Sequence, residues 1–413
     1  MSKLSVGEKL TILADAAKYD ASCASSGAAK RDSLNGRGVG STTKVGICHA
    51  YTPDGRCVSL LKILMTNVCI FDCVYCVNRA SSNVRRARFT AREIVALTID
   101  FYKRNYIEGL FLSSGIIHSS NYTMEQLALV AKSLRLDHDF RGYIHLKTIP
   151  EADQALIDEA ARYADRLSIN IELSDEASLK RFAPDKQHRQ IKTSMGRLRL
   201  RIDEASGERR RSPKAPRYAP AGQSTQLIVG ADAANDMAIM RASGALYANY
   251  NLRRVYYSAF SPIPDSSSAL PLQPPPLMRE HRLYQADWLL RFYGFSLDEI
   301  ATGAPDGMFA LAVDPKLSWA LANRGIFPID VNRAPLEMLL RIPGLGVRGA
   351  NRIVATRRFH ALRFDDLTRI AASTRKLAPF VTTLDWRPVA LTDSAGLRQR
   401  FAPPPRQLDL FAA

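Results

Sequence analysis

The stretch VSLLKILMTNVCIFDCVYC, residues 58–76, joins an apolar run to three closely spaced cysteines. The run 58–65 predicts a buried β-strand, and Cys69, Cys73 and Cys76 fall in the loop that follows it. Three thiolates at this spacing can hold three corners of an iron–sulfur cube. A closed zinc site would need a fourth cysteine or histidine, and none follows in roughly the next forty residues. The pattern therefore predicts a cluster with one open iron; buried structural cysteines are the alternative.

Short β-rich runs alternate with helical stretches from residue 57 to residue 257, as in a parallel sheet with crossover helices. The expected strands are 58–65, 109–113, 142–147, 166–172, 225–230 and 253–258. The expected helices are 91–104, 124–134, 151–163, 175–182, 187–202 and 234–247. Six βα units predict an α/β fold, a partial (β/α)6 TIM-like barrel with its chemistry at the carboxyl ends of the strands. A small all-α module is expected to follow it.

The length of 413 residues predicts more than one domain. We expect an N-terminal helical extension over 1–50, the partial barrel over 51–265, a linker with helices over 266–319, a helical module over 320–390 and a flexible tail over 391–413. The basic, proline-rich segment 206–220 predicts a long exposed loop inside the barrel.

The chain carries 57 lysines and arginines against 40 acidic residues, a net charge of +17. An excess of this size attracts polyanions, and nucleic acid is the leading candidate. No apolar run approaches the length of a membrane span, and the first residues lack the apolar core of a signal peptide. Half of the six cysteines lie in one loop, which fits a reducing compartment. We therefore expect a cytoplasmic protein.

The predicted strand 166–172 alternates apolar and polar residues, so Ser168, Asn170 and Glu172 share one face. In a barrel that face is the interior, where buried polar groups need partners such as the hydroxyls of a ribose. An outer strand with one wet face is the alternative. Weaker candidates for the same pocket are Lys147, Gln223, Ser224 and Gln226.

Cys48, His49 and Cys57 lie close in sequence to the cysteine loop. They are three possible soft ligands for an auxiliary metal, but cysteines packed at the edge of the barrel are the favoured interpretation.

The C-terminal module contains VNRAP, residues 331–335, followed by LRIPGLGVRGA, residues 340–350. This pattern resembles the helix-hairpin-helix family of DNA-binding motifs. Backbone N–H groups at the start of the second helix would bind phosphate without regard to base sequence. Arginines at 341, 348, 352, 357 and 358 flank the hairpin, and a purely structural αα-hairpin is the alternative. The expected DNA-binding residues are Pro343, Gly344, Leu345, Gly346, Arg348 and Arg352.

The last residues form a short apolar peptide behind three prolines: Gln407, Leu408, Asp409, Leu410 and Phe411. A peptide of this kind can dock in a pocket of another protein. It is similar to the pentapeptide with which bacterial replication and repair proteins bind the sliding clamp, so the bacterial sliding clamp is an expected partner.

The cysteine loop resembles that of the radical S-adenosylmethionine (SAM) superfamily. The match includes Tyr75, before the third cysteine, which in that superfamily lies beside the adenine. Ser113, Ser114 and Gly115 stand where the superfamily has a Gly-Gly-Glu-like stretch that binds the methionine amino group. The glutamate is absent here, so the resemblance implies the position of the contact and only loosely its residues. A plain tight turn is the alternative.

The signature with Asn78 and Arg79, the segment 104–109 and the hairpin together resemble the bacterial DNA modification or repair radical SAM protein family. The resemblance implies a [4Fe-4S] cluster on the three cysteines, SAM as cosubstrate, and a low-potential electron donor such as flavodoxin or ferredoxin. It implies a radical reaction on a nucleotide in DNA, with repair and modification both open. A tRNA-modifying radical SAM enzyme and a non-catalytic DNA-binding iron–sulfur protein are the alternatives.

Overall fold

The computed structural model describes residues 4–17, 47–51, 57–389, 392 and 394–402. The chain divides into two compact units. The first comprises residues 1–233 and 245–275, and the second comprises residues 234–244 and 276–413.

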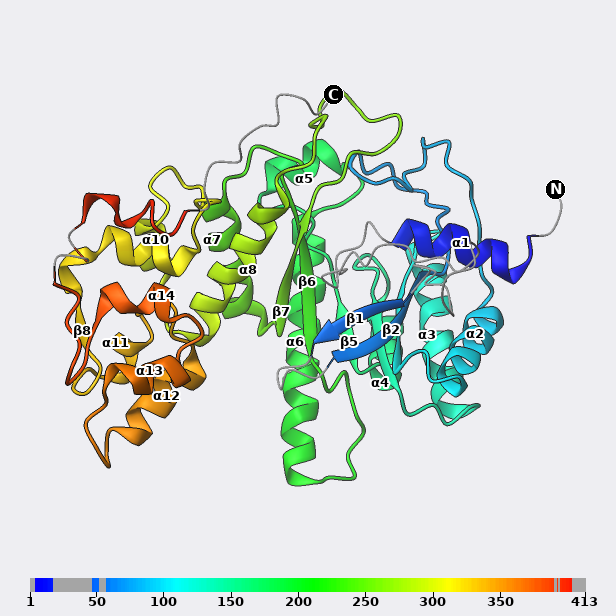
Figure 1. The fold of residues 1–413 in the computed structure, drawn as a ribbon. Coiled ribbons are helices and arrows are strands. Elements are labelled where there is room, and N and C mark those ends of the chain that lie inside the picture. Colours follow the sequence, from blue (N-terminus) through cyan, green and yellow to red (C-terminus); the bar gives the residue numbers. More distant parts are fainter. Residues whose placement is uncertain (1–3, 18–46, 52–56, 390–391, 393, 403–413) are drawn as a thin grey trace, which may run out of the picture. The chain divides into compact units, whose positions relative to one another are not determined.

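The first unit is built on a seven-stranded sheet whose strand order follows the chain (Figure 1). Strands β2 to β7 are parallel, while β1 pairs antiparallel with β2 at the edge. The strands are β1 Ile47–Tyr51, β2 Cys57–Leu64, β3 Gly109–Ser113, β4 Tyr143–Lys147, β5 Arg166–Ser168, β6 Gln223–Val229 and β7 Arg254–Ala259. The sequential order confirms the predicted α/β fold with an open, curled sheet.

Helices connect the parallel strands, and α2, α3 and α4 are neighbours in space as they are in the chain (Figure 1). Local sequence fixes their starts: Thr90 and Glu93 form a capping box at the start of α2. The helices of this unit are α1 Val6–Ala17, α2 Ala91–Lys103, α3 Ser120–Leu136, α4 Gln154–Tyr163, α5 Glu176–Phe182 and α6 His188–Arg211. Helix α7, Asp236–Tyr250, joins β6 to β7 and contains the boundary between the two units.

The core of the first unit lies between the sheet and its helices. Strand β3 is buried along its whole length, and Leu61, Ile63 and Leu110 are fully buried. Continuous apolar strands of this kind are expected where helices cover a parallel sheet. At about 25 cal/mol per Å² of apolar surface, this burial is the main force that stabilises the unit.

Three elements differ from the sequence predictions. The expected loop 206–220 begins later, because α6 continues to Arg211. Three consecutive arginines in its last turn stabilise the helix by interacting with the negative end of its dipole. The expected strand 166–172 ends at Ser168, although Glu172 makes an isolated bridge to Leu227. Strand β1 was not predicted at all, because a five-residue edge strand carries too little periodicity.

In its described residues, the second unit is helical except for one short parallel pair, β8 Ile329–Asp330 with β9 Val381–Thr382. Its longest helix, α8, spans Leu277–Phe292. The others are α9 Leu297–Thr302, α10 Pro315–Ala322, α11 Leu336–Leu339, α12 Val347–Thr356, α13 Phe364–Ile370 and α14 Thr374–Leu377. Among the described residues, no helix has the length and apolar character that crossing a membrane requires.

Candidate active site

The cysteine loop runs beside the segment that follows β3. Met65 N–H donates to the Ser113 carbonyl at 2.8 Å, and Gly115 N–H donates to the Thr66 carbonyl at 2.8 Å. A Cβ atom at Gly115 would overlap the Val68 carbonyl oxygen. Any side chain at position 115 would collide with the cysteine loop. The loop itself therefore requires glycine here, whether or not a ligand approaches the backbone.

The side chain of Arg86 holds the loop from its far end. Its guanidinium donates to four backbone carbonyls, those of Asn67, Asn78, Arg79 and Ser82, the last three at 3.0, 2.6 and 2.8 Å. A planar group with five N–H donors is suited to this task. Arg86 lies ten residues beyond the third cysteine, in a basic stretch where no local pattern predicts a structural role.

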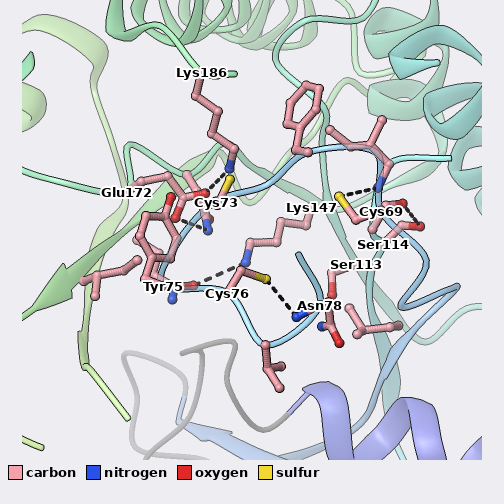
Figure 2. Close-up of a pocket in the computed structure, with 18 of the residues that line it drawn as sticks. Cys69, Cys73, Tyr75, Cys76, Asn78, Ser113, Ser114, Lys147, Glu172 and Lys186 are labelled. Atoms are coloured by element: carbon pink, nitrogen blue, oxygen red, sulfur yellow. Dashed lines mark hydrogen bonds and ion pairs between the residues drawn. The ribbon is translucent and has the colours of Figure 1, made fainter. Parts of the chain in front are cut away.

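The three thiols face one pocket (Figure 2). The Cys69 Sγ accepts a hydrogen bond from Ile116 N–H at 3.4 Å, and the Cys76 Sγ accepts one from Asn78 N–H at 3.4 Å. Burial raises the pKa of the Cys73 thiol to about 12. A proton on this buried sulfur would have to leave before a metal could bind there.

No group of three or more His, Cys, Asp or Glu side chains surrounds a single metal ion in the described part of the chain. A [4Fe-4S] cube does not require such a group, because each cysteine binds a different iron. Three thiols on one loop could hold this cofactor.

The pocket has a volume of about 320 Å³ and lies at the carboxyl ends of the parallel strands. The structure brings together here these residues of the sequence prediction: Cys69, Cys73, Tyr75, Cys76, Ser113, Ser114, Gly115, Lys147, Asn170, Glu172 and Gln226. Ser168 instead bonds the His145 ring at 2.9 Å, and Gln223 donates to the Met195 and Tyr250 carbonyls at 3.1 and 2.6 Å. Ser224 is fully buried and is not part of the lining. Gln223 and Ser224 begin β6, and Ser168 pairs with Ser224, so these three side chains lie away from the carboxyl end of β6 and belong to the core.

Glu172 is placed by an unusual backbone. Its φ of +68° is rare for a residue with a side chain and marks local strain, which often accompanies function. Its Oε1 pairs with the Lys186 Nζ at 2.5 Å, and its Oε2 accepts a bond from the Asn170 amide at 3.5 Å (Figure 2). Burial alone would lower the pKa of Lys186, but the nearby Glu172 carboxylate outweighs it and raises that pKa, so the ammonium stays charged.

Several polar atoms in the pocket have no hydrogen-bond partner among the residues that the structure describes. They are the Tyr75 hydroxyl, the Asn78 and Asn170 Oδ1 atoms and both carboxyl oxygens of Glu151. Buried polar atoms normally have partners, so a lining of this kind fits a polar ligand with many donors and acceptors. SAM, with its amino, carboxylate, ribose and adenine groups, is such a ligand.

Glu151 lines the pocket, although nothing in its local sequence predicts a site residue. It follows β4 by four residues, and burial raises the pKa of its carboxyl. The sequence signal was weak, because a glutamate after a proline at the start of an expected helix is usually a solvated first-turn residue.

The hairpin residues of the second unit fall into two groups. Gly344, with φ of +78°, packs against the Ser373 carbonyl, and Leu345 is buried with its carbonyl bonded to Lys316 Nζ at 2.7 Å. Pro343 is also buried, while Gly346 precedes α12. Arg348 and Arg352 on that helix are exposed.

Two of the flanking arginines are used inside the protein. Arg341 pairs with Glu299 at 2.8 Å, and Arg357 donates to the Val331 and Ala334 carbonyls at 3.0 and 2.6 Å. Of the five arginines that flank the hairpin in the sequence, Arg341 and Arg357 are therefore engaged within the second unit.

The remaining candidates lie at the two ends of the chain. Cys48, on β1, packs partly buried against the apolar cluster of Val58, Leu60 and Phe111. This agrees with packing at the sheet edge. The tail peptide at 407–411 lies outside the described residues.

Residues 63–205 match the model of the Radical SAM superfamily, a range that contains the cysteine loop and the walls of the pocket. This part of the chain is thus a radical SAM domain, and domains of this superfamily use a [4Fe-4S] cluster and SAM. A comparison with curated proteins found no match.

Solved structures similar to this chain include the [FeFe]-hydrogenase maturase HydG from Carboxydothermus hydrogenoformans, SuiB from Streptococcus suis and methylornithine synthase (PylB). Their identities to this chain are 13%, 9% and 16%, and each has a TM-score of 0.40. The alignments cover 55%, 55% and 56% of this chain and 49%, 45% and 61% of those chains. The chain thus spans about half the length of the first of these structures.

Proposed function

We propose that this protein is a radical SAM enzyme that repairs or modifies a nucleotide in DNA. Cys69, Cys73 and Cys76 would hold the [4Fe-4S] cluster. When bound, the cluster would supply the electron for the reductive cleavage of SAM to methionine and a 5′-deoxyadenosyl radical, and that radical would abstract hydrogen from the substrate. A low-potential donor such as flavodoxin or ferredoxin provides that electron.

The walls of the pocket position SAM. Tyr75 lies against the adenine, and Asn170 with Glu172 binds the ribose hydroxyls, which supply a donor for the unpartnered Asn170 Oδ1. Ser113, Ser114 and Gly115 accept the methionine end. Since the segment has no glutamate, we assign the second acidic group of the pocket, Glu151, to the SAM amino group.

The hairpin in the second unit is the single observation that carries the DNA assignment. Its turn ends at Gly346, where a Cβ atom would meet the Tyr293 hydroxyl at 3.7 Å, and this hydroxyl accepts a hydrogen bond from Val347 N–H. The N–H groups that follow Val347 at the start of α12 would bind phosphate. Arg348 and Arg352 are exposed on the same helix and can contact the flanking phosphates.

A salt titration of binding to duplex DNA tests this assignment. Removing both arginines (Arg348→Ala with Arg352→Ala) should weaken binding and lower the slope of log affinity against log salt by roughly 0.9 per lost phosphate contact. The matched control removes two exposed arginines of the first unit, Arg104 and Arg141, and should leave the slope unchanged. Equal slopes for both double variants would contradict the DNA proposal, and tighter binding of structured RNA would favour a tRNA substrate.

The tail peptide 407–411 supports a second partner, the bacterial sliding clamp. Removal of Leu410 and Phe411 should abolish clamp binding in a surface-immobilised assay, because the apolar pair supplies the buried contact. Replacement of the neighbouring Gln399 and Arg400 with alanine is the control. Unchanged binding after the deletion would refute the assignment.

A further inference from the structure

Helix α8 presents a row of aromatic side chains that the proposed function has not used. Tyr284, Trp288 and Phe292 are spaced by four residues and therefore share one helix face. Trp288 is 52% exposed and Phe292 is 48% exposed, with their ring centroids 5.1 Å apart. Large exposed aromatic groups gathered in one place mark interaction sites more often than chance.

A pocket of about 300 Å³ opens beside this row, within the second unit. Its lining consists of Tyr284, Gln285, Trp288, Leu289, Tyr293, Asp314, Pro315 and Lys316. Three aromatic rings and a buried lysine in one pocket of this volume suit a planar, polar-edged group such as a nucleobase.

Two residues of the pocket wall contact the hairpin. The Lys316 Nζ lies 4.7 Å from the centroid of the Tyr293 ring and donates to the Leu345 carbonyl at 2.7 Å. The Tyr293 hydroxyl lies 3.7 Å from the position of a Cβ atom at Gly346 and accepts a hydrogen bond from Val347 N–H. A base held in the pocket would therefore have its phosphate close to the start of α12.

The charges around the pocket favour an anionic chain. The carboxylate of Asp314 is already engaged, because it pairs with Lys376 at 2.6 Å and accepts a bond from Leu317 N–H at 2.9 Å. The Arg291 guanidinium stacks over Phe292 at 4.8 Å from the centroid, and it also pairs with Asp287 at 3.2 Å. The two exposed arginines of α12 then leave an excess of positive charge for phosphates, and Lys316 adds to it below its pKa of about 7.

We infer that the aromatic row of α8 and this pocket form a base-stacking site for single-stranded DNA beside the phosphate-binding hairpin. The inference rests on the proposed function and deepens it. An enzyme that reacts with a base must reach it outside the duplex stack, and aromatic platforms hold unstacked bases without regard to sequence. The substrate is accordingly DNA that is single-stranded or has an unpaired nucleotide.

Fluorescence anisotropy with the cluster-loaded full chain tests this inference. The probes are a thymidine oligonucleotide of about 20 nucleotides, a duplex of equal length and an RNA of matching sequence. We expect the single DNA strand to bind more tightly than the duplex and to quench the fluorescence of Trp288, the most exposed of the three tryptophans.

Replacing Trp288 with alanine should weaken single-strand binding by about tenfold and leave duplex binding within twofold, because a stacked base contributes about one such factor. Trp288→Phe keeps an aromatic face and should retain most of the affinity. This variant distinguishes a loss of base stacking from a loss of folding as the cause of weaker binding. Tyr106→Ala is the matched control, since Tyr106 is also 52% exposed and lies in the first unit.

Four results would overturn the inference. Equal binding of single strand and duplex with no tryptophan quenching would refute base stacking while leaving the DNA proposal intact. Equal losses of affinity for the alanine variant on both DNA probes would also refute it. Tighter binding of the RNA, or no binding of any probe, would refute the DNA proposal together with the inference.

Discussion

The Lys186 ammonium and the Glu172 carboxylate form a buried ion pair at 2.5 Å in the wall of the pocket that the three cysteines enter. The pair joins the segment after α5 to the strained residue after β5. Removing one partner leaves the other charge buried, which typically costs about 3–5 kcal/mol. Glu172 therefore supports the fold as well as the proposed ribose contact.

Glu172→Ala should lower the free energy of unfolding by about 3 kcal/mol and weaken SAM binding. Anaerobic urea denaturation and equilibrium dialysis with labelled SAM measure the two effects. Glu176→Ala is the control: its carboxylate is 63% exposed, and its loss should change stability by less than about 0.5 kcal/mol. Unchanged stability in the Glu172 variant would show that the pair is not formed.

Cys73→Ala should abolish both the iron–sulfur cluster and the formation of 5′-deoxyadenosine, because a cube held by only two cysteines is not retained. Iron and sulfide analysis after anaerobic reconstitution measures the cluster content. Chromatography of the reduced reaction with SAM measures the 5′-deoxyadenosine that forms. Cys48→Ala, at the sheet edge, should leave both unchanged. Survival of either property in the Cys73 variant would show that the ligand assignment is wrong.

Arg86→Lys should make the cluster more labile without unfolding the domain. A lysine has three donors and no planar fork, so it cannot serve the four carbonyls that Arg86 binds. The rate at which a chelator removes iron should rise by about tenfold. Arg85→Lys is the matched control, since the Arg85 side chain is 64% exposed. Equal rates of iron removal from the two variants would show that Arg86 does not hold the cysteine loop.

Single-strand affinity should fall as the pH rises through about 7. Burial lowers the pKa of Lys316 to about 7, so its charge is lost in that range and phosphate attraction decreases. Stability should change in the opposite direction. Between about 7 and the usual lysine value the unfolded chain binds more protons than the folded chain, so the free energy of unfolding rises with pH. Lys316→Met should flatten both profiles. A pH dependence that remains in this variant would show that another group causes it.

The sequence could predict the parallel sheet and the cysteine loop because both rest on local signals. Apolar runs such as 109–113 are continuous in the chain, and the thiol spacing lies within eight residues. Strand alternation also placed Asn170 and Glu172 correctly in the pocket lining, even though regular pairing ends at Ser168.

The missed features depend on partners that are distant in the chain. Arg341 resembles a phosphate contact in sequence, but it pairs with Glu299, 42 residues away. Glu151 enters the pocket because the segment after β4 turns inward, which its own sequence does not show. The Trp288 row has the spacing of an ordinary helix, and only its exposure in the folded unit distinguishes it from core.

The four carbonyl contacts of Arg86 come from both sides of the cysteine loop, because Asn67 precedes Cys69 while Asn78, Arg79 and Ser82 follow Cys76. One guanidinium thus ties the start of the loop to its end. A substitution at position 86 would therefore act on all three thiols together and not on any one of them.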